Sequence, residues 1–390
     1  MKKKVFYYTS AYFLDVSVEL INVLKKHVDL YVFIEITDSS KTSTILNIEK
    51  LLPGRSVVPA EEMMAAADLE NFKAYFDGTR AVNFVVHNYP VGNILKMYRA
   101  AAPLRKMIRQ IRPDVLHFEG FTMRTMGLLP MLRKVKKLVF SVHDSQVHSG
   151  MQHLKVSLPR MAMFRWPVKK QFVFYSDYCR QDFLQNVKHS KAAYLTLGLG
   201  PFYFYKKISL SKPEGSKYLL FFGRISKYKG LNLLLDAMET VWKEFPGEQL
   251  VIAGGGADAA LQQHPVLKRN DGRILFLNRF IPTAELPEII KEAKYVICPY
   301  TDATQSGVLS TSFALNKPVL ATDVGAFREQ IFDEFNGKLV KEPAPELIAA
   351  AIIASLRNDH YKQWEENVRK QNLSNSWEKN AQLLLKAYEV

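Results

Sequence analysis

Cysteine is scarce in this 390-residue sequence: Cys179 and Cys298 are the only two, and they lie far apart. Neither belongs to a CxxC or Cys/His pattern, so the sequence predicts neither a disulfide framework nor a zinc site. The spacing of His148, His153 and His189 is not typical of a metal site either. This sparse use of cysteine fits a reducing cytosol.

Long apolar runs are also lacking. No uninterrupted run approaches the ~20 residues that a membrane-spanning helix needs. The short apolar stretch after residues 1–4 is interrupted by Asp15 and has no small-residue cleavage site, so a buried strand is expected there rather than a signal peptide. Because hydrophobic residues make up 48% and charged residues 23%, the chain reads as an ordinary globular protein, soluble or peripheral to a membrane.

The length of the chain exceeds the size at which one hydrophobic core keeps growing, so two domains are expected. Short β-branched and aromatic runs alternate with amphipathic stretches, the pattern of βαβ units and parallel sheets. Residues 197–217, rich in Gly, Pro, Ser and Lys, are expected to link the two domains. Strands are expected at 5–9, 30–36, 82–87, 115–120, 138–144 and 172–176 in the first half, and at 218–224, 249–255, 274–280, 295–300 and 318–324 in the second.

Positive charge is concentrated in the first half. Residues 1–200 contain 29 Lys and Arg against 16 Asp and Glu, whereas residues 201–390 contain 24 against 22. This asymmetry indicates a polyanionic partner, with charge that serves only solubility as the alternative. The basic helical stretch 93–113 and the basic segments 131–137 and 164–170 favour an anionic membrane surface or lipid. Nucleic acid is not expected, because no recognition motif with interleaved aromatics is present.

The strongest local motif is FFGRISKYKG at 221–230. A buried strand is expected to end at Gly223, followed by Arg224 and then by Lys229 just before a helix. Glycine permits a sharp turn, and cations at a strand-to-helix junction lie where a diphosphate docks. A basic surface turn is the alternative interpretation.

A second motif lies at 299–329, where a strand end is followed by Gln305, Ser306, Gly307 and Val308 and then by a helix of small and apolar residues. A glycine beside hydroxyl side chains at a helix start exposes backbone N–H groups and the positive end of the helix dipole to an anion. The pattern recurs in the same half of the chain, at the same kind of strand end, which strengthens the prediction of a diphosphate site.

Together with VIAGGG (251–256), the segment 278–300, PVLATDVGAFRE (318–329) and NGKLV (336–340), these motifs resemble glycosyltransferase family 4, the retaining GT-B enzymes of the glycosyl transferases group 1 type. The resemblance is clearest over 217–345 and weaker in the first half. It implies an α/β protein with two Rossmann-like doubly wound domains facing each other across a cleft. Residues 1–205 would bind the acceptor, with a closing helix at 376–390 packing back onto them, and residues 206–375 would bind the donor.

The chemistry that the resemblance implies is a metal-independent transfer of a sugar from a nucleotide diphosphate to an acceptor hydroxyl, with retained configuration and no cofactor. Arg224 and Lys229 would neutralise the leaving diphosphate, aided by the N–H groups around Ser306, Gly307 and Val308.

Further site residues follow from the same resemblance. Phe280 and Ile281 match positions that cradle the base, and His143 matches a histidine that positions the donor sugar; a structural histidine that caps the next helix is the alternative. Glu119 and Asp144, at strand ends, are weaker candidates for acceptor contacts. His117 lies within a strand and is expected in the core.

The sequence also departs from the family. Two glutamates that members carry eight positions apart are absent, because Ala303 and Thr311 occupy those positions. Asp302 is then the candidate for the sugar contact and Thr311 for a ribose hydroxyl. The glycine pair of the first loop is replaced by TSAYFLD at 9–15. Because of these changes, the sequence does not indicate which nucleotide sugar is the donor.

The sequence thus predicts a retaining, hexosyltransferase-type glycosyltransferase of polysaccharide or glycan biosynthesis, cytoplasmic or peripheral on the inner face of the cell membrane. Its partners would be a nucleotide-sugar donor and a glycan or lipid-linked acceptor. One alternative is a non-catalytic GT-B protein that binds nucleotide or a partner. The other is a nucleotide-sugar epimerase, which converts the donor without an acceptor.

Overall fold

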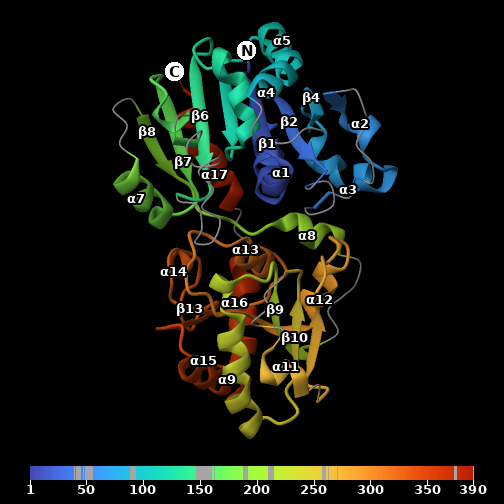
Figure 1. Ribbon diagram of the computed structural model, residues 1–390, viewed down its shortest axis with the longest axis vertical. Helices are drawn as coiled ribbons and strands as arrows, with labels where there is room; N and C mark the ends of the chain where they lie inside the picture. The colour runs from blue at the N-terminus through green and yellow to red at the C-terminus, as the bar shows by residue number, and fades with distance from the viewer. Residues whose placement is uncertain are drawn as a thin grey trace. The chain divides into compact units, whose positions relative to one another are not determined.

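In the computed structural model, the chain forms two compact units (Figure 1). Unit 1 comprises Met1–Gly198 and Ser376–Val390, and unit 2 comprises Leu199–Asn375. His148, His153 and His189 lie outside the described residues, as does part of the expected linker. The structure describes residues 1–38, 40, 45–46, 48, 56–87, 94–145, 160–161, 163–187, 192–209, 215–256, 261, 263–269, 271–372 and 376–389.

Unit 1 is built on an eight-stranded sheet within the described residues, in the order β3-β4-β2-β1-β5-β6-β7-β8. All neighbouring strands are parallel except β3 and β4, which are antiparallel. The order reverses between β1 and β5, the point at which doubly wound sheets open a crevice for ligands. The strands are β1 (Lys4–Ser10), β2 (Asp29–Thr37), β3 (Val57–Pro59), β4 (Ala81–His87), β5 (Val115–Glu119), β6 (Lys137–Val142), β7 (Lys170–Phe174) and β8 (Ala192–Thr196).

Helices connect these strands, and the last helix of the chain returns to them. Figure 1 shows α17 beside the strands of unit 1, where it packs on α1. The expected return of residues 376–390 to the first unit is thus found in the structure. The helical elements of unit 1 are η1 (Ala11–Phe13), α1 (Leu14–Leu24), α2 (Ala60–Met63), α3 (Ala66–Phe76), α4 (Ile94–Ala100), α5 (Ala102–Ile111), η2 (Met123–Met131), α7 (Asp177–Asn186) and α17 (Ser376–Ala387).

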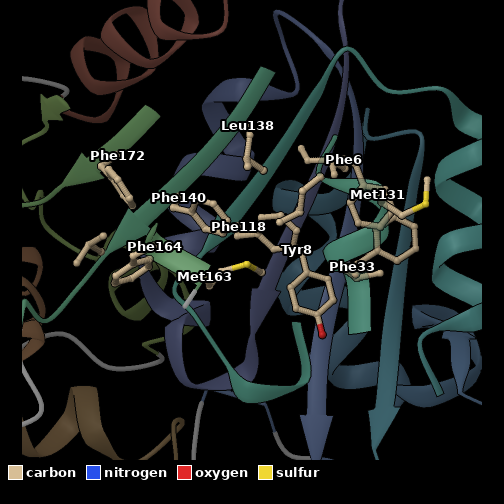
Figure 2. Close-up of a cluster of buried hydrophobic side chains, with 14 of the residues drawn as sticks. Phe6, Tyr8, Phe33, Phe118, Met131, Leu138, Phe140, Met163, Phe164 and Phe172 are labelled. Carbon is tan, nitrogen blue, oxygen red and sulfur yellow. The ribbon is translucent and has the colours of Figure 1, made fainter. Parts of the chain in front are cut away.

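The core on one face of this sheet is strongly aromatic. Phe6 stacks on Phe33 with ring centroids 4.1 Å apart, and Phe118 stacks on Phe140 at 5.1 Å. Figure 2 shows these rings with Tyr8, whose hydroxyl points out of the cluster. Because side chains alternate between the faces of a strand, the neighbours of these residues point to the opposite face.

Unit 2 has a six-stranded parallel sheet in the order β11-β10-β9-β12-β13-β14. Its strands are β9 (Tyr218–Phe222), β10 (Leu250–Ala253), β11 (Ile274–Leu277), β12 (Ala293–Cys298), β13 (Val319–Thr322) and β14 (Gly337–Val340). Its helical elements are α8 (Tyr203–Ile208), η3 (Lys227–Lys229), α9 (Leu231–Glu244), α11 (Pro265–Arg269), α12 (Leu286–Glu292), α13 (Gly307–Ala314), α14 (Phe327–Gln330), α15 (Pro345–Leu356), η4 (Arg357–Asp359) and α16 (His360–Gln371).

The division between the units falls before the expected boundary at residue 205. The backbone N–H of Phe202 donates to the Ser310 carbonyl at 3.1 Å, and the Gln330 amide donates to the Leu199 carbonyl at 3.0 Å. These bonds attach the segment that contains α8 to unit 2, so this unit begins at Leu199.

The strands expected from the sequence are all present, and β3, β8 and β14 are additional. β3 has three residues and ends in Pro59, and β14 begins with a glycine, so neither carries a clear strand pattern. Among the described residues, no helix combines the length and the apolar character that crossing a membrane requires.

Candidate functional site

Glycines bring the carboxyl ends of three strands of unit 2 close together. Gly223 follows β9 with φ 104°, a conformation that favours glycine. A Cβ at Gly254, after β10, would lie 2.0 Å from the Gly223 carbonyl oxygen, and one at Gly230 would lie 1.9 Å from the carbonyl oxygen of Pro299. Only glycine fits at these positions, so the motifs around 223, 254 and 299 form one surface.

Lys229 and the start of α13 converge on Gly223. A Cβ placed on Gly223 would lie 3.0 Å from the Lys229 ammonium nitrogen and 3.2 Å from a Val308 methyl carbon. Gly307 is the first residue of α13, and Ser306 is its N-cap but makes no side-chain capping bond. The first N–H groups of a helix have no intrahelical partner. Five residues predicted from the sequence therefore lie together in unit 2: Gly223, Lys229, Ser306, Gly307 and Val308.

The Lys229 ammonium is buried without a compensating anion. Lys229 is 7% exposed, and its ammonium nitrogen lies 5.0 Å from the centre of the Tyr300 ring. Within the described part of the chain, it makes no hydrogen bond and no ion pair. Burial, with a smaller effect of the neighbouring Arg224 charge, lowers the pKa of Lys229 to about 8. A buried cation in this state favours an anionic ligand.

The other predicted donor-side residues differ in their exposure. Arg224 lies on the surface beside this place and has no ion pair among the described residues. Phe280 is 50% exposed whereas Ile281 is buried, so an exposed ring stands next to an anchored side chain. Such a ring offers a flat surface on which a base can stack.

The loop before α13 and the start of that helix contain the positions at which this sequence differs from the family it resembles. Asp302 is exposed and Gln305 is half-buried. Ala303 is buried, and a Cβ on Gly325 would lie 1.7 Å from its carbonyl oxygen, so this position packs against the chain. Thr311 is also buried, and its hydroxyl donates to the Gly307 carbonyl at 2.8 Å. That bond occupies the hydroxyl proton that was expected for a ribose contact.

In unit 1 a hydrogen-bond network surrounds Glu119 at the end of β5. The side chain is fully buried, and each of its oxygens accepts two hydrogen bonds. Oε1 accepts from His143 at 2.7 Å and from the Tyr175 hydroxyl at 2.8 Å, and Oε2 accepts from the hydroxyls of Tyr7 and Ser141, each at 2.9 Å. The prediction that Glu119 contacts an acceptor is therefore wrong, because no oxygen of this carboxylate reaches the surface.

The ionisation of Glu119 follows from these bonds. Burial by itself raises the pKa of the carboxyl, but the hydrogen bond from His143 and the nearby histidine charges outweigh it and lower the pKa to about 2. Because a carboxylate only accepts, His143 donates from Nε2, which leaves the lone pair of a neutral ring on Nδ1. Glu119 thus fixes the tautomer and the orientation of His143.

The network extends to the last helix. His117 Nε2 lies 2.9 Å from the Ser141 hydroxyl, and His117 Nδ1 lies 2.6 Å from the Tyr388 hydroxyl. Since Ser141 donates to Glu119, His117 donates to Ser141 and accepts from Tyr388. Burial lowers the pKa of His117 to about 4, so the ring is neutral near pH 7. His117 therefore lies in the core, as expected. In the series of hydrogen bonds from Tyr388 through His117 and Ser141, each group donates in the direction of Glu119.

His143 lies between two aromatic rings. The Phe13 ring stacks on the imidazole at 4.1 Å and the Tyr175 ring stacks at 5.0 Å. A Cβ on Gly120 would lie 2.1 Å from the Phe13 ring, so glycine at this position makes room for it. No motif in the sequence indicates this role for Phe13, which lies in the segment 9–15.

Two more acidic residues lie near these rings. Asp15, at the start of α1, is partly buried, and burial raises its pKa to about 6. Asp144 is half-buried, and its charge acts on Arg160 and Cys179. In the described part of the chain, no group of three or more His, Cys, Asp or Glu residues is arranged to hold a metal ion.

The comparisons with known proteins agree with this geometry. Residues 205–371 match the family model described as Glycosyl transferases group 1. This match lies within unit 2 and covers most of it. The phosphatidyl-myo-inositol mannosyltransferase of Mycobacterium tuberculosis is 35% identical over 157 residues, which are 38% of this chain and 40% of that protein. The matched part of this relative is thus less than half of its length.

Solved structures resemble the whole chain. A glycosyltransferase of Rickettsia africae has a TM-score of 0.66 at 15% identity and covers 100% of this chain and 98% of its own. The Anabaena protein HepE, in complex with UDP-glucose, has a TM-score of 0.69 at 14% identity. The match covers 98% of this chain and 100% of the HepE chain. This likeness shows the fold, which is GT-B with two Rossmann-like α/β units.

Proposed function

We propose that this protein is a glycosyltransferase that takes a sugar from a nucleotide diphosphate and transfers it to an acceptor hydroxyl. The observation that carries the proposal is the buried, uncompensated Lys229 ammonium at the start of α13, in a unit that matches the model of the glycosyl transferases group 1 family. A diphosphate supplies the missing negative charge, and the helix start supplies N–H donors to the same anion.

The transfer step requires charge stabilisation on the leaving group. When the bond between the anomeric carbon and the diphosphate oxygen breaks, negative charge grows on that oxygen. Arg224, Lys229 and the N–H groups at Ser306, Gly307 and Val308 are the proposed stabilising groups. The acceptor hydroxyl forms the new bond and its proton passes to the leaving phosphate, so neither a cofactor nor a metal ion is assigned to this step.

The base, the sugar and the acceptor are assigned to further residues. Phe280 and Ile281 are assigned to the base, Asp302 and Gln305 to the sugar, and His143 to positioning of the transferred sugar. We further propose retention of configuration, a hexosyl donor and a lipid-linked acceptor at a cytoplasmic membrane face, in glycan or polysaccharide biosynthesis. The basic first half of the chain supports a lipid-linked acceptor, as does its similarity to the mycobacterial phosphatidyl-myo-inositol mannosyltransferase.

The test is release of nucleoside diphosphate from a panel of UDP-, GDP- and ADP-sugars by the full chain. One donor is expected to be consumed, with a rate lowered about 100-fold or more in Lys229→Met. Lys227→Met is the matched control, because Lys227 lies on the same 3-10 turn but is exposed. An unchanged rate in Lys229→Met would contradict the assignment.

A specific observation favours one alternative, a protein that binds nucleotide without turnover. Both acidic positions of the family are filled here by buried residues, Ala303 and Thr311, that offer no carboxylate. Binding of a nucleotide sugar without any release of nucleoside diphosphate, with acceptor extracts present, would establish this alternative in place of the enzyme.

A further inference from the structure

A second buried glutamate lies in unit 1, on the face of the sheet opposite to Glu119. Glu35 lies near the end of β2 and is 3% exposed. Its Oε2 accepts hydrogen bonds from the hydroxyls of Tyr8 and Thr122, each at 2.6 Å. The neighbouring residues Tyr7 and Tyr8 thus donate to different glutamates, since successive side chains of β1 point to opposite faces.

The hydrogen bonding of this second cluster is incomplete, unlike that of Glu119. Oε1 of Glu35 has one hydrogen bond among the described residues, from Arg124 Nη1 at the long distance of 3.4 Å. The Nε atom of Arg124 is buried and has no hydrogen-bond partner in the same part of the chain. A buried donor without an acceptor costs free energy, so an acceptor atom is expected beside it.

The position of the cluster is one where ligands bind. Thr122 and Arg124 follow β5, and Glu35 lies two residues before the end of β2, so the cluster flanks β1 near the carboxyl edge of the sheet, where the strand order reverses. The Arg124 side chain keeps 15% of its surface exposed, so the cluster lies just below the surface of the protein.

The charges in the cluster indicate which ligand fits. Glu35 and Arg124 carry opposite charges. His87, whose Nε2 lies 4.0 Å from Glu35 Oε2, is neutral near pH 7 because burial lowers its pKa to about 4. A phosphate would add uncompensated negative charge beside Glu35, whereas a hydroxyl accepts from Arg124 and donates to Glu35 without changing the net charge.

We propose that Glu35 and Arg124 form a binding site for a hydroxyl of a neutral polyol, such as a sugar or cyclitol ring. Arg124 Nε–H donates to the hydroxyl oxygen, and the hydroxyl donates to Glu35 Oε1. Thr122 and Tyr8 hold the carboxylate in place. That this polyol is the acceptor of the transfer reaction rests on the proposed function; the binding itself does not.

The experiment measures binding to the full chain without any donor, by saturation-transfer NMR. The neutral probes are methyl α-D-glucopyranoside, methyl α-D-mannopyranoside and myo-inositol, and the anionic probes are inorganic phosphate and glycerol 1-phosphate. Arg124→Met and Glu35→Gln are expected to weaken binding of a neutral probe about tenfold or more. Arg109→Met is the matched control on the exposed side of α5 and is expected to bind as the parent does.

Arg124→Lys separates binding from folding. It keeps the positive charge beside Glu35 but lacks the Nε donor, so it is expected to fold as the parent does and to bind as weakly as Arg124→Met. Parent-like binding in Arg124→Lys and Glu35→Gln would overturn the proposal, as would binding of the anionic probes alone. UDP-induced stabilisation, measured on the same samples, tests the donor site separately, so failure of the proposed function is seen independently.

Discussion

Glu119, at the end of β5 in unit 1, and Lys229, in the 3-10 turn before α9 in unit 2, are both buried ionic side chains, but their surroundings differ. Glu119 accepts four hydrogen bonds, and its pKa is lowered to about 2. Lys229 has no anion or acceptor within the described ranges, and its pKa is lowered to about 8. The charge of the glutamate is thus stabilised by its surroundings, whereas that of the lysine is destabilised.

This difference indicates what each residue does. A charge whose partners are all internal holds other groups in place, as Glu119 holds His143, and needs no ligand. A buried charge without a partner lowers the stability of the free protein and gains most when a ligand of opposite charge binds. The Glu119 network of the first unit is therefore preorganised, whereas the proposed anion site of the second unit gains its missing negative charge only from a ligand.

The largest expected effect concerns the stability that Glu119 provides. Glu119→Gln places an amide among four donors, so we expect it to lower the free energy of unfolding of unit 1 by about 3 kcal/mol. Tyr388→Phe removes only the outermost donor of the network and is expected to cost about 1 kcal/mol. Urea unfolding followed by circular dichroism measures both, and equal costs would contradict the central place of Glu119.

This contribution has a defined pH dependence. The folded-state pKa of Glu119 is lowered from 4.5 to about 2, so its stabilisation is fully present above pH 4.5 and is lost as the pH falls towards 2. The difference in unfolding free energy between the parent and Glu119→Gln is therefore expected to shrink over this range. A difference that stays constant down to pH 2 would show that the cost is steric.

A smaller effect of opposite sign is expected for Lys229. Its folded-state pKa is lowered from 10.5 to about 8, so between these values the unfolded chain binds more protons and the stability of the parent rises with pH. Lys229→Met is therefore expected to be more stable than the parent below pH 8, by about 3 kcal/mol at most, and to lose this advantage towards pH 10.5. Melting curves from pH 7 to 10 test this, and Lys227→Met should show no such trend.

The sequence predicted which residues lie together in unit 2 better than it predicted the network of unit 1, for a physical reason. Gly223, Lys229 and Gly307 belong to short motifs in which glycine and charge mark strand ends, so local spacing was sufficient to place them at one site. The Glu119 network instead joins Tyr7 to the last helix through Tyr388, and its partners meet only through the parallel register of the sheet. No local pattern carries that information.

The same contrast explains the errors within the sites. Glu119 lies at a strand end, where exposed ligand-binding residues are common, but it is enclosed by hydroxyls from β1, from β6 and from the residue that follows β7. Thr311 matches a ribose-binding position, but its hydroxyl bonds to the preceding turn of α13. Glu35 and Arg124 carried no motif, and they come together only because β2 and the segment after β5 lie on either side of β1.

The most direct test of the central claim is the thermal stabilisation of the full chain by UDP, GDP and ADP, in the parent and in Arg224→Ala/Lys229→Ala. We predict that one nucleoside diphosphate raises the melting temperature of the parent, because it binds the folded state and neutralises the buried ammonium, and that the double variant shows no increase. The same increase in the double variant, or none in the parent with any of the three, would contradict the account.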